Sequence, residues 1–418
     1  MLKSLRLENV GPAEHLEWDF APRLNVITGD NGLGKSFILE ICWWALTQNW
    51  VSHFARPTSE NPAKISFSIG GDGKVGPGEG LFNRRLQDWT SPGRPTHLGL
   101  VLFAQVDGSF AVWDPARNSL STRNERAHGK GDNRPPAFMF TPSDLWDGLE
   151  WQNGVLCNGL IRDWALWQTQ NGKTFEQLQA VLARLSPSND EEITPGELTR
   201  VSLDDVRDIP TLRMPYGQEV PVSLASAGMK RILGLAYLLV WSWHEHQQAS
   251  KLLGEPVTQQ VVFLIDEAES HLHPKWQRTI MGALLDVMTA LSGTDEVSLQ
   301  VLATTHSPLL LASLEPRFNP EIDALWTLEL KDKAVVGERQ EWRIHGDANR
   351  WLTSPIFDFD QPGSAEAEKA IERAKLALRE RQTTDLESIT AELQRVLSET
   401  DPFWVRWLWH LENLSRSR

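Results

Sequence analysis

One glycine-rich segment constrains the fold of this chain more than any other part of its sequence. Residues 24–36 read LNVITGDNGLGKS, and an apolar-rich run follows at 37–46. The short apolar run before the glycines predicts a buried strand, and the longer run after them predicts a helix. We therefore expect a strand, a tight loop and a helix in that order.

The loop fits the spacing G-x-x-x-x-G-K-[ST], with Gly29, Gly34, Lys35 and Ser36 at the defined positions. Glycines let the backbone turn tightly, so that successive N–H groups point at phosphate oxygens. The helix that begins here adds the positive end of its dipole. Lys35 is predicted to reach the β- and γ-phosphates and Ser36 to hold Mg²⁺. The residues predicted to bind the nucleotide are Asn31, Gly32, Leu33, Gly34, Lys35, Ser36 and Phe37.

Composition narrows the class of protein. The chain has 418 residues, of which 41% are hydrophobic and 23% charged, as in ordinary soluble proteins. No apolar run approaches the roughly 20 residues that span a bilayer, and the start does not resemble a signal peptide. Cys42 and Cys157 do not make a disulfide framework, so we expect a reducing cytoplasm. The net charge of −14 argues against a protein covered in nucleic acid, but it does not exclude a local basic groove.

Two later apolar runs each end in polar residues. VVFLI at 261–265 is followed by Asp266 and Glu267, and the run at 299–302 leads to a polar triplet that ends at His306. The carboxyl ends of buried parallel strands face the ligand crevice of a sheet. We predict that Asp266 holds Mg²⁺ and that Glu267 polarises the attacking water as general base. His306 is predicted to hydrogen-bond the γ-phosphate or that water.

Small residues stand just before another strongly apolar helix, with Ser226 and Gly228 on either side of Ala227. A serine and a glycine at a helix N-terminus suit an anion such as a γ-phosphate, whereas the plainer interpretation is a simple N-cap. Two histidine pairs have spacing that can bind a metal, but no third ligand cluster accompanies them, so packing and turn roles are favoured. They are His244 with His246 and His271 with His273.

Other segments carry weaker signals. Alternating apolar residues predict a hairpin within 1–23, short strands within 63–113 and a further hairpin over 324–345. Residues 143–186 are helical in character, and two helices are expected over 364–381 and 384–415. The segment 114–136 is predicted to be a mobile, mildly basic, solvated loop, with a contact to DNA or a partner as the alternative. Its basic residues are Arg117, Arg123, Arg126, Lys130 and Arg134.

Taken together and in this order, the motifs resemble the ABC-type ATPases of the RecF/SMC/OLD group, often described as AAA-family ATPases. The opening LRLENVGPAEHLEWDFAPRLNVITGDNGLGKS resembles that group's hairpin and Walker A motif. SLASAGMKR resembles its signature motif, FLIDEAESHLHP its Walker B motif with the D-loop, and TTHSP its switch histidine. The resemblance covers roughly 1–110 and 220–330.

The resemblance implies an α/β P-loop NTPase fold with an ABC-ATPase-like head, an N-terminal β-hairpin region, a helical insertion and a C-terminal helical hairpin. The expected parts are 1–142, the first part of the head with a β-rich lobe; 143–219, the mainly helical insertion; 220–345, the second part of the head; and 346–418, a helical C-terminal region. No sustained heptads and no Toprim pattern are visible, so a compact form without either is expected.

The resemblance also implies ATP and Mg²⁺ as ligands and a homodimer that encloses ATP. Ser226 and Gly228 of one copy would touch the γ-phosphate held by Lys35 of the other. Three features depart from the family pattern, and the first is the distance of 197 residues from Gly29 to Ser226 (226 − 29), which is longer than in transporter ATPases. Ala227 replaces a second glycine, and the glutamine of the Q-loop is not clear, with Gln105 and Gln168 as candidates.

The expected function is a cytoplasmic, Mg²⁺-dependent ATPase that acts as a switch, with no membrane partner. Family members of this compact type imply a role in DNA transactions or antiphage defence, beside a separate effector such as a nuclease, and DNA is a possible ligand. The alternative is a nucleotide-gated scaffold that hydrolyses ATP negligibly. A transporter ATPase is a third possibility, which the middle region and the sequence HLHP disfavour.

Overall fold

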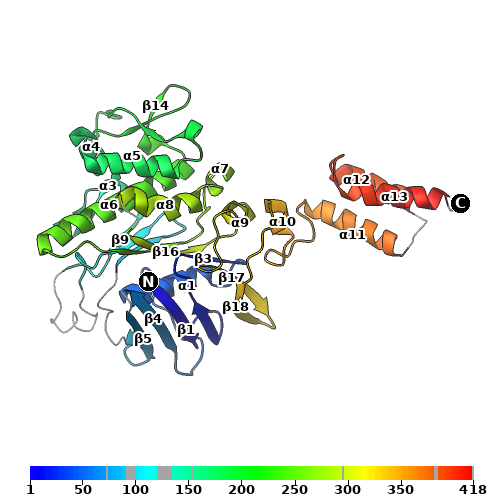
Figure 1. Cartoon of the computed structure of the whole chain (residues 1–418), viewed down its shortest axis with the longest axis horizontal. Coiled ribbons are helices and arrows are strands. Elements are labelled where there is room, and N and C mark those ends of the chain that lie inside the picture. The colour runs from blue at the N-terminus through cyan, green and yellow to red at the C-terminus, as the bar shows by residue number, and fades with distance from the viewer. Residues whose placement is uncertain are drawn as a thin grey trace. The chain divides into compact units, whose positions relative to one another are not determined.

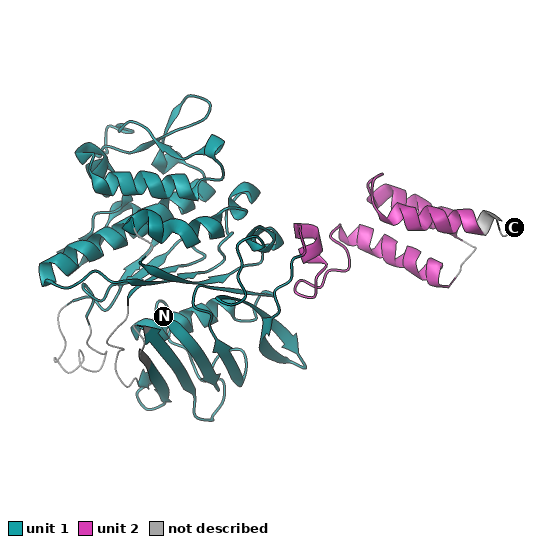
Figure 2. Ribbon diagram, viewed as in Figure 1, with its two compact units in different colours: residues 1–344 teal, residues 345–418 magenta. Residues whose placement is uncertain are grey.

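The structure is a computed structural model whose chain divides into two compact units, residues 1–344 and 345–418 (Figure 2). The residues that it describes are 1–71, 74–90, 99–119, 134–152, 154–293, 296–380 and 385–416. Within these ranges, no helix combines the length and the apolarity that a membrane span requires.

The first unit is built on an eight-stranded sheet in the order β18-β17-β3-β16-β15-β7-β8-β9. Its strands are β3 (Leu24–Gly29), β7 (Leu100–Ala104), β8 (Phe110–Trp113), β9 (Phe138–Phe140), β15 (Gln260–Ile265), β16 (Ser298–Thr304), β17 (Asp323–Lys331) and β18 (Ala334–Gln340). The five strands from β17 to β7 pair in parallel, whereas β8, β9 and β18 add antiparallel edges. The predicted strands at the glycine-rich loop, at 261–265 and at 299–302 are confirmed, as is the hairpin over 324–345.

The register of the parallel strands aligns their carboxyl ends. Ile265 pairs with Ala303 on one side and with Ala104 on the other, and Thr304 pairs with Ile27. Strands β3, β16, β15 and β7 therefore end at the same edge of the sheet. Because β16 lies between β3 and β15, the segment after β16 borders both the glycine-rich loop and the acidic pair.

Helix α1 (Lys35–Thr47) packs between this sheet and a second, antiparallel one in the order β2-β1-β4-β5-β6 (Figure 1). The strands of that sheet are β1 (Leu2–Glu8), β2 (His15–Asp19), β4 (Lys64–Gly71), β5 (Lys74–Asn83) and β6 (Asp88–Thr90). Most side chains of α1 are buried, including Ile38, Trp43 and Leu46, which suits a helix between two sheets. The predicted N-terminal hairpin is confirmed as β1 with β2.

Helices cover the other face of the large sheet. They are α3 (Pro142–Asp147), α4 (Leu160–Gln170), α5 (Lys173–Leu185), α6 (Ala227–Leu253), α7 (Pro274–Gln277), α8 (Ile280–Ser292) and α9 (Pro308–Leu314). Helix α5 packs against both α6 and α8.

The expected helical insertion over 143–219 also contains strands. A hairpin of β10 (Leu149–Trp151) and β11 (Gly154–Cys157) separates α3 from α4. A small sheet of β12 (Thr194–Pro195), β13 (Thr211–Arg213) and β14 (Glu219–Pro221) lies before the signature motif, with short 3₁₀ turns at Asn189–Glu191 and Val222–Leu224.

The second unit consists of α10 (Ala348–Leu352), α11 (Ala365–Arg379), α12 (Leu386–Val396) and α13 (Phe403–Arg416). The helix expected over 364–381 is confirmed as α11, but the single helix expected over 384–415 is wrong. The chain leaves the helical conformation at Leu397, and α13 starts directly after Pro402, where the Asp401 carboxylate accepts from the Phe403 amide at 2.8 Å. The sequence shows a signal for this break, because the polar residues 398–401 precede Pro402.

The basic segment 114–136 has a buried beginning, and its residues 120–133 lie outside the described ranges. The Arg117 guanidinium lies 4.5 Å from the ring centre of Phe138 and 4.9 Å from that of Trp241. Asp114 is buried and bonds the His246 imidazole at 2.8 Å. The expectation of a solvated loop is therefore wrong for 114–119, and His246 has the packing role that the sequence favoured.

Candidate nucleotide-binding and hydrolysis site

The loop between β3 and α1 has the backbone shape that its glycines allow. Gly29 and Gly34 have φ values of +136° and +96°, which side chains larger than hydrogen rarely tolerate. A Cβ on Gly29 would lie 2.3 Å from the Leu328 carbonyl oxygen. Gly34 is the N-cap of α1 and supplies no side-chain hydrogen bond, so the first amides of the helix are left to a ligand.

The predicted nucleotide-binding residues divide by exposure. Asn31, Gly32 and Ser36 face solvent, whereas Leu33 is buried. Phe37 is half-buried against the turn between β1 and β2, since a Cβ added at Gly11 would lie 2.3 Å from its ring. Ser36 therefore offers an open hydroxyl at the start of α1, as a cation ligand requires.

The Lys35 ammonium lies over its own loop. Its Nζ donates to the carbonyl oxygens of Gly29 and Asp30, each at 2.8 Å. Burial lowers the pKa of Lys35, and the carboxylates of Glu267 and Asp266 oppose that shift. The acids that follow β15 therefore act electrostatically on the lysine that follows β3, although more than 200 residues separate them in the sequence.

The acidic pair after β15 is held by Thr304 at the end of β16. The Thr304 hydroxyl donates to Asp266 Oδ1 and accepts from the Glu267 amide, both at 2.7 Å. Asp266 is 3% exposed, whereas Glu267 is half-buried and has a left-handed backbone with φ of 46°. Ser36 and Asp266 together provide the hard oxygen donors that Mg²⁺ prefers, so the residues present fit that ion.

His306 is half-buried at the same edge of the sheet. Burial and the nearby Lys35 ammonium hold the pKa of His306 below its ordinary value, and the Glu269 carboxylate acts in the opposite direction. The imidazole is therefore neutral near pH 7 and can donate one hydrogen bond and accept another. That capacity suits contact with a phosphate oxygen or a water molecule.

Ser226 is the N-cap of α6, and its side chain accepts from the Met229 amide at 3.3 Å. The N-cap interpretation is thus correct as local structure, and it leaves the exposed Ser226 and Ala227 at a helix start that faces solvent. Gly228 has a different constraint, because a Cβ there would lie 2.7 Å from the His271 carbonyl oxygen. The signature helix therefore meets the segment after Asp266 and Glu267 at close range.

Replacing Gly228 with alanine is expected to lower the free energy of unfolding by about 1–3 kcal/mol, since the added methyl group meets backbone that cannot move cheaply. Thermal and denaturant unfolding would measure the loss. Gly76→Ala is the matched control, because nothing lies within 4 Å of a Cβ there, and it should change stability by less than about 0.5 kcal/mol. Equal stability of the two variants would contradict the close contact with His271.

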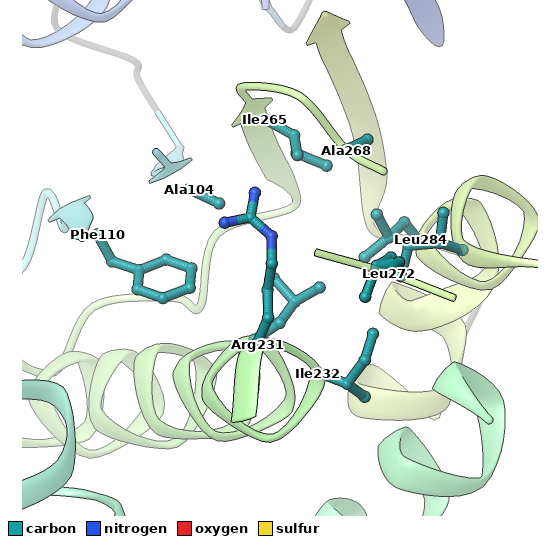
Figure 3. Close-up of a pocket in the computed structure, with 10 residues that line it drawn as sticks. Ala104, Phe110, Arg231, Ile232, Ile265, Ala268, Leu272 and Leu284 are labelled. Carbon is teal, nitrogen blue, oxygen red and sulfur yellow. The ribbon is translucent and has the colours of Figure 1, made fainter. Parts of the chain in front are cut away.

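Sequence reasoning missed Arg231, which lies one turn into α6. Its Nη1 donates to the Gln105 and Val106 carbonyl oxygens at 3.0 and 3.2 Å. Its Nη2 donates to those of Asp266 and Glu267 at 3.1 and 3.3 Å. Figure 3 shows the side chain extending from α6 between the ends of β7 and β15, beside an apolar cavity. The local signal was a pair of cations, Lys230 and Arg231, ahead of the apolar part of the helix, which does not reveal what either binds.

The two candidate Q-loop glutamines lie in different parts of the structure, and a histidine of each pair bonds within the protein. Gln105 follows β7 at the sheet edge where β15 also ends, whereas Gln168 bonds the Gly196 carbonyl oxygen from α4 in the insertion. His273 caps α7 by accepting from the Lys275 amide at 3.3 Å, and His244 bonds Thr174 at 3.1 Å. In the ranges that the structure describes, no group of three His, Cys, Asp or Glu residues could hold a metal ion.

Comparison with known proteins gives several relatives. The chain is similar to "Septu protein PtuA" of Bacillus thuringiensis, with 22% identity over 86% of this chain and 83% of that one. It is also similar to "Retron Vc95 probable ATPase" of Vibrio cholerae serotype O1 biovar El Tor, with 26% identity over 28% of this chain and 22% of that one. The DNA replication and repair protein RecF of an Exiguobacterium strain is 30% identical over 27% of this chain and 34% of its own length.

Among solved structures, the SMC head domain from Thermotoga maritima matches 82% of this chain and 99% of its own, with 14% identity and a TM-score of 0.41. Residues 24–312 match the family described as "AAA domain, putative AbiEii toxin, Type IV TA system". That segment is more than half of the 418 residues and contains the glycine-rich loop, the acidic pair and His306. The chain therefore belongs to this AAA-domain family, as an ABC-type ATPase with a P-loop NTPase fold.

Proposed function

We propose that the protein binds Mg²⁺-ATP, hydrolyses it to ADP and phosphate, and does so as a homodimer closed around the nucleotide. One observation carries this proposal. The lysine of the glycine-rich loop, the acidic pair and the histidine lie at one sheet edge, while Ser226 is exposed at the start of α6 and its hydroxyl bonds the Met229 amide of its own helix. A second copy can bring that helix start to the phosphate.

Each residue then has one task. The loop amides and Lys35 hold the phosphates, and Ser36 and Asp266 would hold Mg²⁺. When bound, Mg²⁺ supplies charge neutralisation on the phosphate oxygens. Glu267 takes the proton of the attacking water, and neutral His306 hydrogen-bonds the terminal phosphate. Ser226 and the Gly228 amide of the second copy stabilise the same phosphate from the opposite side.

The biological setting that we propose is a DNA transaction or antiphage defence in the cytoplasm, beside a separately encoded effector such as a nuclease. Relatives named for a retron, for Septu and for DNA replication and repair support this class of role. The free, buried thiols of Cys42 and Cys157 are compatible with a reducing compartment. DNA is a proposed ligand of the assembly, and its measured binding should weaken with salt.

A second candidate is a nucleotide-gated scaffold that holds a partner and hydrolyses ATP negligibly. The observation that favours it lies in α13, where Val405, Leu408 and Trp409 are 75%, 52% and 68% exposed. These residues lie three and four positions apart and so share one helix face. An ATPase rate equal to that of a Glu267→Gln blank across a wide range of protein concentrations would favour the scaffold.

The test of the shared site uses two inactive variants. Ser226→Arg should bind ATP as the monomer does but lose hydrolysis, because the larger side chain replaces the Ser226 hydroxyl at the phosphate held by the second copy. Glu267→Gln should also be inactive, for lack of a base. Mixing equal amounts before ATP is added should restore activity, because each mixed dimer has one intact site.

The control for this test is each variant mixed with itself, at the same total concentration. The restored activity should stay below about half of the wild-type rate, since a mixed dimer carries one of two sites. Normal hydrolysis by Ser226→Arg alone would contradict the shared site, as would the absence of any restoration. The wild-type rate per molecule should also climb with protein concentration until the dimer saturates.

A further inference from the structure

Glu269, three residues after the acid predicted to hold Mg²⁺, uses both of its carboxylate oxygens. Oε1 accepts from the backbone amide of His306 at 2.5 Å. Oε2 accepts from the Thr305 hydroxyl at 2.7 Å. One half-buried carboxylate therefore holds two consecutive residues of the segment that follows β16. Hydrogen bonds to a charged acceptor are among the strong ones in proteins.

The contact to His306 is made through its backbone. The amide hydrogen bond restrains the peptide plane before the His306 Cα, and this plane decides the direction in which the imidazole leaves the chain. On the other side, the Thr305 amide donates to the Ile27 carbonyl oxygen of β3 at 3.0 Å. The peptide that carries His306 is thus fixed between the strand of the glycine-rich loop and the carboxylate of Glu269.

Hydrogen bonds also hold Ser307, the residue that follows His306. The Ser307 amide donates to the Thr305 hydroxyl at 3.0 Å, and the Ser307 hydroxyl donates to Gln277 Oε1 at 2.8 Å. Thr305 therefore accepts from Ser307 while donating to Glu269. This chain of hydrogen bonds gives residues 305–307 one conformation, and Glu269 is its charged member.

The carboxylates of Glu267 and Glu269 differ in the hydrogen bonds that they accept. Glu267 uses its backbone amide toward Thr304, and its carboxylate accepts no hydrogen bond from the residues that the structure describes. The carboxylate of Glu269 is fully engaged by Thr305 and His306. A general base needs a free oxygen for water, so Glu267 suits that role and Glu269 suits a supporting one.

We propose that Glu269 is a positioning residue for hydrolysis, which holds the backbone of Thr305 and His306 so that the His306 imidazole faces the terminal phosphate. The proposal rests on the proposed function, because it assigns a task within the same site. It adds a residue whose carboxylate acts on the reaction through His306 and touches neither substrate nor metal. Catalytic sites depend on such supporting contacts, because small displacements of a reacting group cost much of the rate.

The test is a double-mutant cycle on the full-length protein, with ATP as the ligand. Glu269→Ala should lower kcat by about 10- to 100-fold, as expected for the loss of charge-assisted hydrogen bonds to a catalytic segment. ATP affinity and KM should change by less than about threefold, since Lys35 and the loop keep the phosphates. His306→Ala should lower kcat comparably. In the double variant the two losses should not multiply, because Glu269 acts through His306.

Substitutions at Thr305 test the second hydrogen bond without changing the charge. Thr305→Ser keeps the hydroxyl and should hydrolyse ATP at nearly the wild-type rate. Thr305→Val has the same shape without the hydroxyl and should lower kcat by about three- to tenfold. Glu269→Gln, which keeps one acceptor for the His306 amide, should fall between wild type and Glu269→Ala. Glu269→Gln replaces Glu269→Ala in the test if the Glu269→Ala protein fails to fold.

The outcomes separate the two proposals. A wild-type rate equal to that of Glu267→Gln would overturn the proposed function and this inference with it. A normal wild-type rate with an unchanged kcat in Glu269→Ala and Glu269→Gln would overturn the inference alone. Losses that multiply in the double variant would show that Glu269 acts independently of His306, which also overturns it. Equal rates for Thr305→Ser and Thr305→Val would contradict the second hydrogen bond.

Discussion

Replacing Lys35 with alanine is expected to weaken ATP binding by about 100-fold, the loss typical of a charge-assisted contact to phosphate. Lys35 is the cation at the centre of the loop, and its ammonium already lies within 2.8 Å of two loop carbonyl oxygens. Without it, the β- and γ-phosphates lose their counter-charge while the loop amides remain. Calorimetric titration of ATP into the Glu267→Gln and Lys35→Ala/Glu267→Gln proteins would measure affinity without turnover.

Two further variants separate binding from folding. Lys35→Met keeps the aliphatic stem within the loop and should lose affinity as alanine does, with less effect on thermal unfolding. Lys251→Ala removes an exposed lysine from the last turn of α6 and should bind ATP normally. Unchanged ATP affinity in both Lys35 variants would contradict the assignment of the glycine-rich loop as the phosphate site.

Replacing Glu267 with glutamine is expected to leave ATP binding intact and to lower the hydrolysis rate by about 10²- to 10⁴-fold, the usual contribution of a general base. The substitution keeps the shape of the side chain and the amide hydrogen bond to Thr304, so the backbone with φ of 46° should be retained. Because ATP then persists, the closed dimer should accumulate. Single-turnover kinetics and light scattering on a sizing column would measure the two effects.

The control for Glu267 is Glu255→Gln, which changes an exposed glutamate just after α6. It should hydrolyse ATP at the wild-type rate. Wild-type turnover in Glu267→Gln would remove Glu267 as the base and direct attention to His306. Loss of ATP binding in that variant would instead indicate that the carboxylate has a structural role at the loop.

The local parts of the fold could be predicted from the sequence because local physics determines them. Gly29 and Gly34 stand where the backbone takes positive φ, and Lys35 begins a helix whose side chains are mostly apolar and buried. Runs of apolar residues of strand length indicated β3, β15 and β16 without any knowledge of their neighbours. The one helix predicted over 384–415 was wrong although the break has a local signal, since the polar run at 398–401 is followed by Pro402.

The tertiary structure alone decided which residues meet. The order of the strands places β16 between β3 and β15, and Thr304 consequently holds both Asp266 and Glu267. Arg231 binds four carbonyl oxygens from two strand ends, and Glu269 binds the segment of His306. These contacts join residues 35 to 126 positions apart, and their partners are mostly backbone atoms, which every residue carries. A motif therefore determined where the proposed phosphate site lies, whereas the pairing of distant strands decided which side chains support it.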